Sequence, residues 1–142
     1  MKQMRILTIL GILFLGSISS FSQTLKEKAE GGDMVAQYQY AQKLSDSMFP
    51  SKEDLSEAVQ WLTKSALQGY APAQCNLGFH YSQGIGINQN KEQAVYWYKK
   101  AAEQDDATAQ YNLGTCYANG HGVPRSAYSA YNWYKKSAEQ GY

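Results

Sequence analysis

Small and apolar residues recur along the chain at intervals of three and four, which places them on one face of an α-helix. The first such segment spans residues 34–43, and three longer ones span residues 55–68, 91–104 and 127–140. In the longer segments, small residues flank a larger one, which lets two antiparallel helices approach closely. The pattern therefore predicts an all-α chain of paired helices. The three stripes are Ala58, Leu62 and Ser65, then Ala94, Tyr98 and Ala101, then Ala130, Tyr134 and Ser137.

One stretch of this pattern returns after 36 residues. Residues 73–78 read Ala-Gln-Cys-Asn-Leu-Gly, and residues 109–114 read Ala-Gln-Tyr-Asn-Leu-Gly. Trp-Tyr-Lys-Lys occurs twice at the same interval, starting at Trp97 and at Trp133. A repeat of this length indicates stacked helix pairs. The predicted units span approximately residues 33–70, 71–106 and 107–142, and the first is a degenerate copy in its front half.

Short polar side chains that accept hydrogen bonds from exposed amides mark the helix starts. Asp54, Asn90 and Ser126 lie at 36-residue intervals, and we expect them to be the N-caps of the second helices. Glu57 and Gln93, three residues further on, are expected to complete a capping box in the first two units. The expected starts of the first helices are the N-caps Asp33 and Asp106 and the first-turn proline Pro72.

Glycines separate the two helices in the later units. Gly84 and Gly86 occupy this place in the second unit, and Gly120 and Gly122 in the third. The backbone freedom of glycine ends a helix and turns the chain back. In the first unit, residues 45–53 contain a proline and no glycine, so we expect a different turn there.

The first 22 residues have the layout of a secretory signal peptide. Lys2 and Arg5 precede an apolar run over residues 6–18, and small residues follow. We place cleavage after Ser22, which predicts an exported domain, periplasmic or secreted, over residues 23–142. The alternative is an uncleaved anchor, although a membrane-spanning helix needs about 20 apolar residues and this run is shorter.

The charge balance narrows the choice of partners. Removing Lys2 and Arg5 from the 13 basic residues leaves 11 against 12 acidic residues, a net charge of −1. Such a balance gives no support for binding nucleic acid or an anionic membrane. Cys75 and Cys116 fall at different places in the repeat, whereas a disulfide framework would more naturally recur with the period. A bridge between them stays an open alternative.

No arrangement of reactive side chains predicts an enzyme. The Gly-Ile-Gly at residues 84–86 follows no predicted strand and lacks the Lys-Ser/Thr of a phosphate loop, so we interpret it as a turn. His80 and His121 have no metal-ligand spacing with each other or with the cysteines. The lysine pairs at residues 99–100 and 135–136 are interpreted as a solvated face. We expect no catalytic residue, no metal and no cofactor.

The repeated positions are spread over both helices and the turn of each unit. In the second unit they are Leu77-Gly78, Tyr81, Gly84-x-Gly86, Ala94, Trp97-Tyr98, Ala101-Ala102 and Gln104. In the third unit they are Leu113-Gly114, Tyr117, Gly120-x-Gly122-Val123, Ala130, Trp133-Tyr134, Ala138 and Gln140-Gly141. This combination resembles the Sel-one-like repeat, a relative of the tetratricopeptide repeat. The chain departs from the family where a lysine commonly precedes the alanine of the second helix, since it has Glu57, Gln93 and Ser129 there.

The resemblance implies a right-handed α-solenoid of about three stacked antiparallel helix pairs, whose first helices line a concave face. It also implies function by binding, because no catalytic residue set is shared among such proteins. Similarity to tetratricopeptide geometry assigns eight variable positions to the concave face: Tyr38, Gln42, Cys75, Phe79, Gln83, Tyr111, Thr115 and Asn119.

We therefore predict an exported scaffold or adaptor that binds a protein or peptide segment on this concave face. The alternative is a carbohydrate or peptidoglycan-fragment binding module that uses the many tyrosines. Trp61, Trp97 and Trp133 recur with the period, which favours a role in the core over a sugar-stacking platform. The last helix keeps its internal pattern with no helix left to cover it, so this end is expected to be a truncation or a self-association face.

Overall fold

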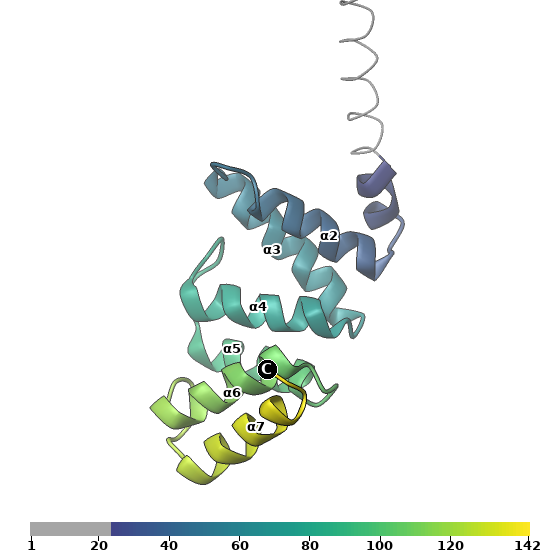
Figure 1. The fold of residues 1–142 in the computed structure, drawn as a ribbon. Coiled ribbons are helices and arrows are strands. Elements are labelled where there is room, and N and C mark those ends of the chain that lie inside the picture. Colours follow the sequence, from purple (N-terminus) through teal and green to yellow (C-terminus); the bar gives the residue numbers. More distant parts are fainter. Residues whose placement is uncertain (1–23) are drawn as a thin grey trace, which may run out of the picture.

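The structure, a computed structural model, describes residues 24–142, and the regular elements of this part are helices joined by short turns (Figure 1). The predicted signal peptide, residues 1–22, lies outside the described residues. A short helix over residues 24–30 precedes three helix pairs, and each pair contacts the next through its second helix. The pairs are α2 (Met34–Ser45) with α3 (Lys52–Leu67), α4 (Ala71–Gln83) with α5 (Lys91–Ala102), and α6 (Ala107–Asn119) with α7 (Ala127–Glu139).

Four of the predicted N-caps are confirmed. Asp33 and Asp106 each accept a hydrogen bond from the backbone amide three residues further on, at 2.8 Å. Asn90 accepts from the amide of Gln93 at 2.9 Å, but its own amide donates to the carbonyl oxygen of Tyr81, so the predicted capping box with Gln93 is not formed. Ser126 accepts from the equivalent amide at 3.2 Å. These bonds satisfy amides that have no partner within the helix.

The start of α3 differs from the prediction, because its N-cap is Ser51 and the helix begins at Lys52. Ser51 Oγ accepts from the amide of Asp54 at 3.0 Å, and the carboxylate of Asp54 accepts from the amide of Ser51 at 2.9 Å. This capping box satisfies two amides at once, which explains why Asp54 lies inside the helix. Glu57 is outside the box, and it accepts instead from Trp61 Nε1 at 3.2 Å.

Glycines end α4 and α6 as predicted. Gly84 and Gly120 have φ angles of 72° and 71°, in the left-handed region that favours glycine. Gly86, the second glycine of its turn, lies against the backbone carbonyl of Leu55 with no room for a Cβ. The third unit repeats this contact one repeat later. Each turn is therefore seated on the second helix of the preceding unit.

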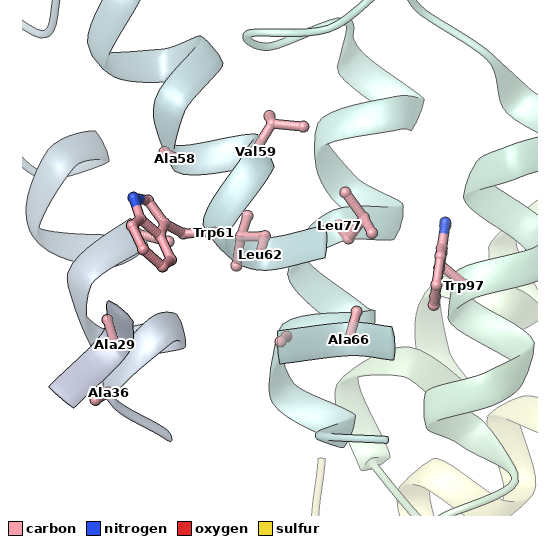
Figure 2. Packing of buried hydrophobic residues seen from close by; sticks show 11 residues of the cluster. Ala29, Ala36, Ala58, Val59, Trp61, Leu62, Ala66, Leu77 and Trp97 are labelled. Atoms are coloured by element: carbon pink, nitrogen blue, oxygen red, sulfur yellow. The ribbon is translucent and has the colours of Figure 1, made fainter. Parts of the chain in front are cut away.

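The core at the boundary between the first two units is shown in Figure 2. Leu62 of α3 and Leu77 of α4 are 2% and 0% exposed. Trp61 and Trp97 are 7% and 8% exposed and belong to the same cluster. Full burial of one such apolar side chain contributes about 1.5–3 kcal/mol. The prediction of a core role is confirmed for these two tryptophans.

A buried glutamine links each unit to the helix that precedes it. Gln74 Nε2 donates to the carbonyl oxygen of Ala66 at 3.0 Å, and Gln74 Oε1 accepts from Gln104 Nε2 at 2.7 Å. Gln37 and Gln110 make the equivalent bonds in the first and third units. Because buried polar groups need partners, these bonds fix how consecutive units sit against each other.

The helix α7 leaves one face uncovered. Its Trp133 is only partly buried, so the predicted core role does not extend to this tryptophan. Tyr131 is 64% exposed, whereas its equivalents Val59 and Val95 are 5% and 8% exposed. Ala138 is exposed as well. The reason is that α3 and α5 bury this face against the next unit, and no helix follows α7 in the described chain.

Candidate functional site

Eight positions were predicted to line the concave face, which we call the groove. They lie on α2, α4 and α6 and differ in exposure. Phe79 and Tyr111 carry the largest exposed rings, with 47% and 46% of their surface accessible. Cys75 is 5% exposed. The remaining five are Gln83 and Asn119, which are exposed, and Tyr38, Gln42 and Thr115, which are half-buried.

The assignment of Cys75 to the accessible groove surface is wrong. This residue occupies the position of Tyr38 and Tyr111 in the neighbouring units, but a thiol is much shorter than a phenol and ends below the surface. Its side chain hydrogen-bonds to Asp106 and Asn112. Burial, reinforced by the carboxylate of Asp106, raises the pKa of Cys75 to about 12. The thiol is therefore protonated and unreactive at neutral pH.

The two tyrosines at this repeat position each contact the last residue of their own unit. The rings of Tyr38 and Tyr70 lie 5.4 Å apart between centroids, and those of Tyr111 and Tyr142 lie 5.5 Å apart. Tyr111 also lies 5.3 Å from the ring of Tyr134. Aromatic pairs at these distances add stability beyond the area that they bury. The first helices of the first and third units thus each carry an aromatic pair with the end of their own unit.

Two hollows lie next to each other along this face. The first hollow, of about 350 Å³, lies between α2, the start of α3, and α4. The second hollow, of about 300 Å³, lies between α4, α5 and α6. Phe79 lines both. The two linings are repeat-equivalent, through the pairs Gln42 and Phe79, Ser45 and Ser82, Leu62 and Tyr98, Asn76 and Asn112, Phe79 and Thr115, His80 and Cys116, and Ile85 and His121.

The sequence identified part of these linings. Ser82 and Asn112 were missed, yet each lies three positions from a predicted residue on the same helix, so helical spacing was the available signal. Lys91 and His121 come from a second helix and a turn, and no sequence pattern linked them to the groove. The predicted residues that do line a hollow are Gln42, Phe79, Gln83 and Thr115.

Side chains of the first hollow are held by hydrogen bonds. Nδ1 of His80 lies 2.8 Å from the carbonyl oxygen of Ile85 and donates to it. Burial lowers the pKa of His80, so the ring is neutral at pH 7. At the rim, the hydroxyl oxygen of Tyr38 accepts from Gln42 at 3.0 Å and from Asn76 at 3.4 Å. This wall is therefore ordered and polar.

The second hollow has a tyrosine at its base. The hydroxyl of Tyr98 donates to Ser82 Oγ at 3.4 Å, and burial raises the pKa of Tyr98 to about 12. Thr115 Oγ1 lies 3.1 Å from the hydroxyl of Tyr134, within hydrogen-bond distance. Burial also raises the pKa of the Cys116 thiol. The positive charge of Lys91 lowers this pKa, but by less than burial raises it. This thiol is not an activated nucleophile at neutral pH.

Other chemistry finds no support in the described residues. Between residues 24 and 142, no three His, Cys, Asp or Glu side chains are grouped to hold a metal ion. Cys75 and Cys116 are both free. In the same part of the chain, no helix has the length and apolar character needed to cross a membrane.

The Sel1 repeat model matches three consecutive segments, residues 35–70, 71–106 and 107–142. The chain therefore belongs to the Sel1 repeat family, as its motifs predicted, and proteins of this family are generally protein-interaction scaffolds. A comparison with curated proteins finds no match.

Solved structures of related proteins confirm the predicted solenoid of stacked helix pairs. The protective antigen c5321 of uropathogenic Escherichia coli, which displays an SLR fold, is 39% identical with a TM-score of 0.80, covering 85% of this chain. This chain spans only 26% of that antigen. A Sel1 repeat protein from Oxalobacter formigenes is 36% identical with a TM-score of 0.76, covering 84% of this chain and 90% of that one. Cysteine rich protein B of Helicobacter pylori is similar in fold, with a TM-score of 0.67 at 20% identity over 89% of this chain and 90% of its own.

Proposed function

We propose that the protein is an interaction scaffold that binds an extended segment of a partner protein across α2, α4 and α6. The observation that carries this proposal is the pair of repeat-equivalent hollows on either side of Phe79. Phe79 is a large ring, 47% exposed, and Tyr111 on the next first helix is 46% exposed. Exposed aromatic side chains beside pockets are common anchors in protein interfaces.

A photocrosslinking amino acid placed at residue 79 tests this function in cells that make the protein. The expected result is a discrete crosslinked species of higher mass from residue 79 and from residue 111. The same probe at Tyr128, which is 78% exposed on α7 and lines neither hollow, is the matched control. Crosslinks of equal yield from all three sites, or none from residues 79 and 111, would contradict the proposal.

We also propose that the scaffold works outside the cytoplasm, after cleavage behind Ser22. The support is the arrangement of charges and apolar residues in the first 22 residues, together with the similarity to an E. coli protective antigen. Mass spectrometry of the protein recovered from the cell envelope or medium tests this. A chain that starts at Gln23 is expected, whereas an intact Met1 in the mature protein would count against cleavage.

Carbohydrate binding is not favoured by the positions of the aromatic rings. Trp61 and Trp97 are buried in the core and offer no face to a sugar. The exposed rings Tyr96 and Tyr128 lie on different second helices, away from the two hollows. Quenching of tryptophan fluorescence by glycan fragments but not by peptides would reverse this preference.

The uncovered face of α7 supports a third proposal, self-association through the last helix. Tyr131 and Ala138 are exposed at positions that α3 and α5 bury against the next unit. Buried apolar area drives most protein association. We expect the mass measured by sedimentation to rise with concentration, and the variant Tyr131→Lys to remain monomeric. A wild-type protein that stays monomeric at high concentration would exclude this role.

A further inference from the structure

The two hollows have equivalent linings but different charges. At two repeat-equivalent positions, one hollow has an aspartate or a lysine where the other has an uncharged residue. Asp46 at the end of α2 corresponds to Gln83 at the end of α4, and Leu55 of α3 corresponds to Lys91 at the start of α5. The helix ends that surround each hollow are the same in both, so backbone dipoles do not explain the difference. Among the described aspartate, glutamate, lysine and arginine side chains, only Asp46 lines the first hollow and only Lys91 lines the second, so the first is acidic and the second basic.

The first hollow offers hydrogen-bond acceptors to a cation. Asp46 is exposed, and the lining contains no lysine or arginine. Because His80 donates from Nδ1 to Ile85 in its neutral form, its Nε2 can only accept a hydrogen bond. A lysine or arginine side chain of a partner fits this set of groups.

The second hollow has the opposite preference. Lys91 is exposed and no carboxylate lines this hollow. The carboxylate of Asp106 is nearby, but it caps α6 by accepting from the amide of Ala109, hydrogen-bonds to the buried Cys75, and lines neither hollow. An aspartate or glutamate side chain of a partner is therefore the complement of this hollow.

The spacing of the hollows sets the spacing of the complementary charges. Both hollows border the side chain of Phe79, so groups that contact it from the two sides stand roughly 8–10 Å apart. An extended chain advances about 3.3 Å per residue, so three positions cover this distance. Phe79 lies between the hollows and provides an apolar surface for the side chains in between.

We propose that the groove selects an extended peptide segment in which a basic and an acidic side chain stand three positions apart with an apolar side chain between them. The basic side chain lies in the first hollow beside Asp46, and the acidic one lies in the second hollow beside Lys91. This inference rests on the proposed function, because it specifies the partner segment that the scaffold binds. The segment can run in either direction, because the structure fixes the positions of the charges and not the chain polarity.

Four fluorescent peptides with uncharged ends test the charge selection. They contain Lys-Phe-Ala-Glu, Glu-Phe-Ala-Lys, Lys-Phe-Ala-Lys and Glu-Phe-Ala-Glu, and binding to the purified protein is followed by fluorescence anisotropy. We expect the two peptides with opposite charges to bind about fivefold more tightly than the two with like charges, since exposed charge pairs are individually weak. The difference should shrink when the salt concentration is raised, because salt screens exposed charges.

Charge reversal in the protein makes the test specific. In Asp46→Lys both hollows are basic, so Glu-Phe-Ala-Glu becomes the preferred peptide. In Lys91→Glu both are acidic, and Lys-Phe-Ala-Lys becomes preferred. The double variant restores the preference for opposite charges. Both changes suit the helix dipoles, because Lys then follows the end of α2 and Glu begins α5, so the fold is retained, as circular dichroism will show.

The control is Lys135→Glu on α7, which removes a lysine that lines neither hollow and leaves the order of the four peptides unchanged. Equal binding of all four peptides, to wild type and variants alike, overturns the charge selection but leaves the scaffold function intact. If no peptide binds while residue 79 crosslinks to a partner in cells, the selection fails and the function stands. Failure of both experiments overturns both proposals.

Discussion

Gly78 lies directly against the ring of Tyr98, so closely that a Cβ on the glycine would stand 2.7 Å from the ring. The third unit repeats this contact between Gly114 and Tyr134, with a distance of 2.8 Å. In the first unit the equivalent positions hold an alanine and a leucine. The residue on the first helix is therefore small where its partner on the second helix is large, a relationship that the stripes of the second helices did not include.

This relationship predicts the effect of Gly78→Ala. The added methyl group has to displace a buried ring, which costs about 1–3 kcal/mol of unfolding free energy in a packed core. Urea unfolding followed by circular dichroism measures the loss. The double variant Gly78→Ala with Tyr98→Leu reproduces the Ala41 and Leu62 pair of the first unit, and we expect it to recover part of the stability. If the double variant recovered no stability, the contact between residues 78 and 98 would not be the cause of the loss in Gly78→Ala.

The glutamine bonds between units predict a second loss. Gln74→Leu removes the donor to Ala66 and the acceptor for Gln104, and leaves buried polar groups without partners. The expected cost is about 1–3 kcal/mol, measured by chemical denaturation. Gln60→Leu is the matched control, because Gln60 is exposed on α3 and its replacement should change stability by less than about 0.5 kcal/mol. If both changes lowered stability equally, the loss in Gln74→Leu could not be attributed to its hydrogen bonds.

The three tryptophans should differ on truncation. Trp61→Ala creates a cavity at a site that is 7% exposed, which costs about 3–5 kcal/mol. Trp133 is only partly buried, so Trp133→Ala should cost roughly half as much. Thermal and urea unfolding of the two variants make the comparison. A larger loss for Trp133→Ala would mean that another chain covers α7 in solution.

Stability should fall at alkaline pH. Burial raises the pKa of Cys75 from 9.0 and that of Tyr98 from 10.0, both to about 12. Above pH 9 the unfolded chain releases these protons while the folded chain keeps them, so the stabilisation is complete below pH 9 and declines toward pH 12. Unfolding free energies at pH 8, 9, 10 and 10.5 test this. Cys75→Ala should flatten the decline, and an unchanged slope would refute the contribution of the thiol.

The 36-residue period predicted the helix pairs, the family, the N-caps Asn90 and Ser126, and the first-turn proline Pro72. It failed at Asp54, because the same period does not hold through a turn without glycine and the nearby Ser51 makes the better cap. The similarity to tetratricopeptide geometry failed at Cys75, because it gives the position of a residue on the helix and not the length of its side chain.

The candidate groove was predicted only in part, for a physical reason. The similarity to tetratricopeptide geometry pointed to Gln42, Phe79, Gln83 and Thr115, which line the hollows. Lys91 and His121 reach the second hollow from the start of α5 and from the turn after α6. The positions of these two residues depend on how each turn packs on the preceding unit. The spacing of residues within one helix carries no information about that packing.

Phe79 belongs to the walls of both hollows, and this position has a consequence for how they fill. Among the residues that the structure describes, it is the only side chain that lines both hollows. A substitution at this one position therefore changes both hollows at once. Loss of the ring in Phe79→Ala would alter the two ends of a bound segment together.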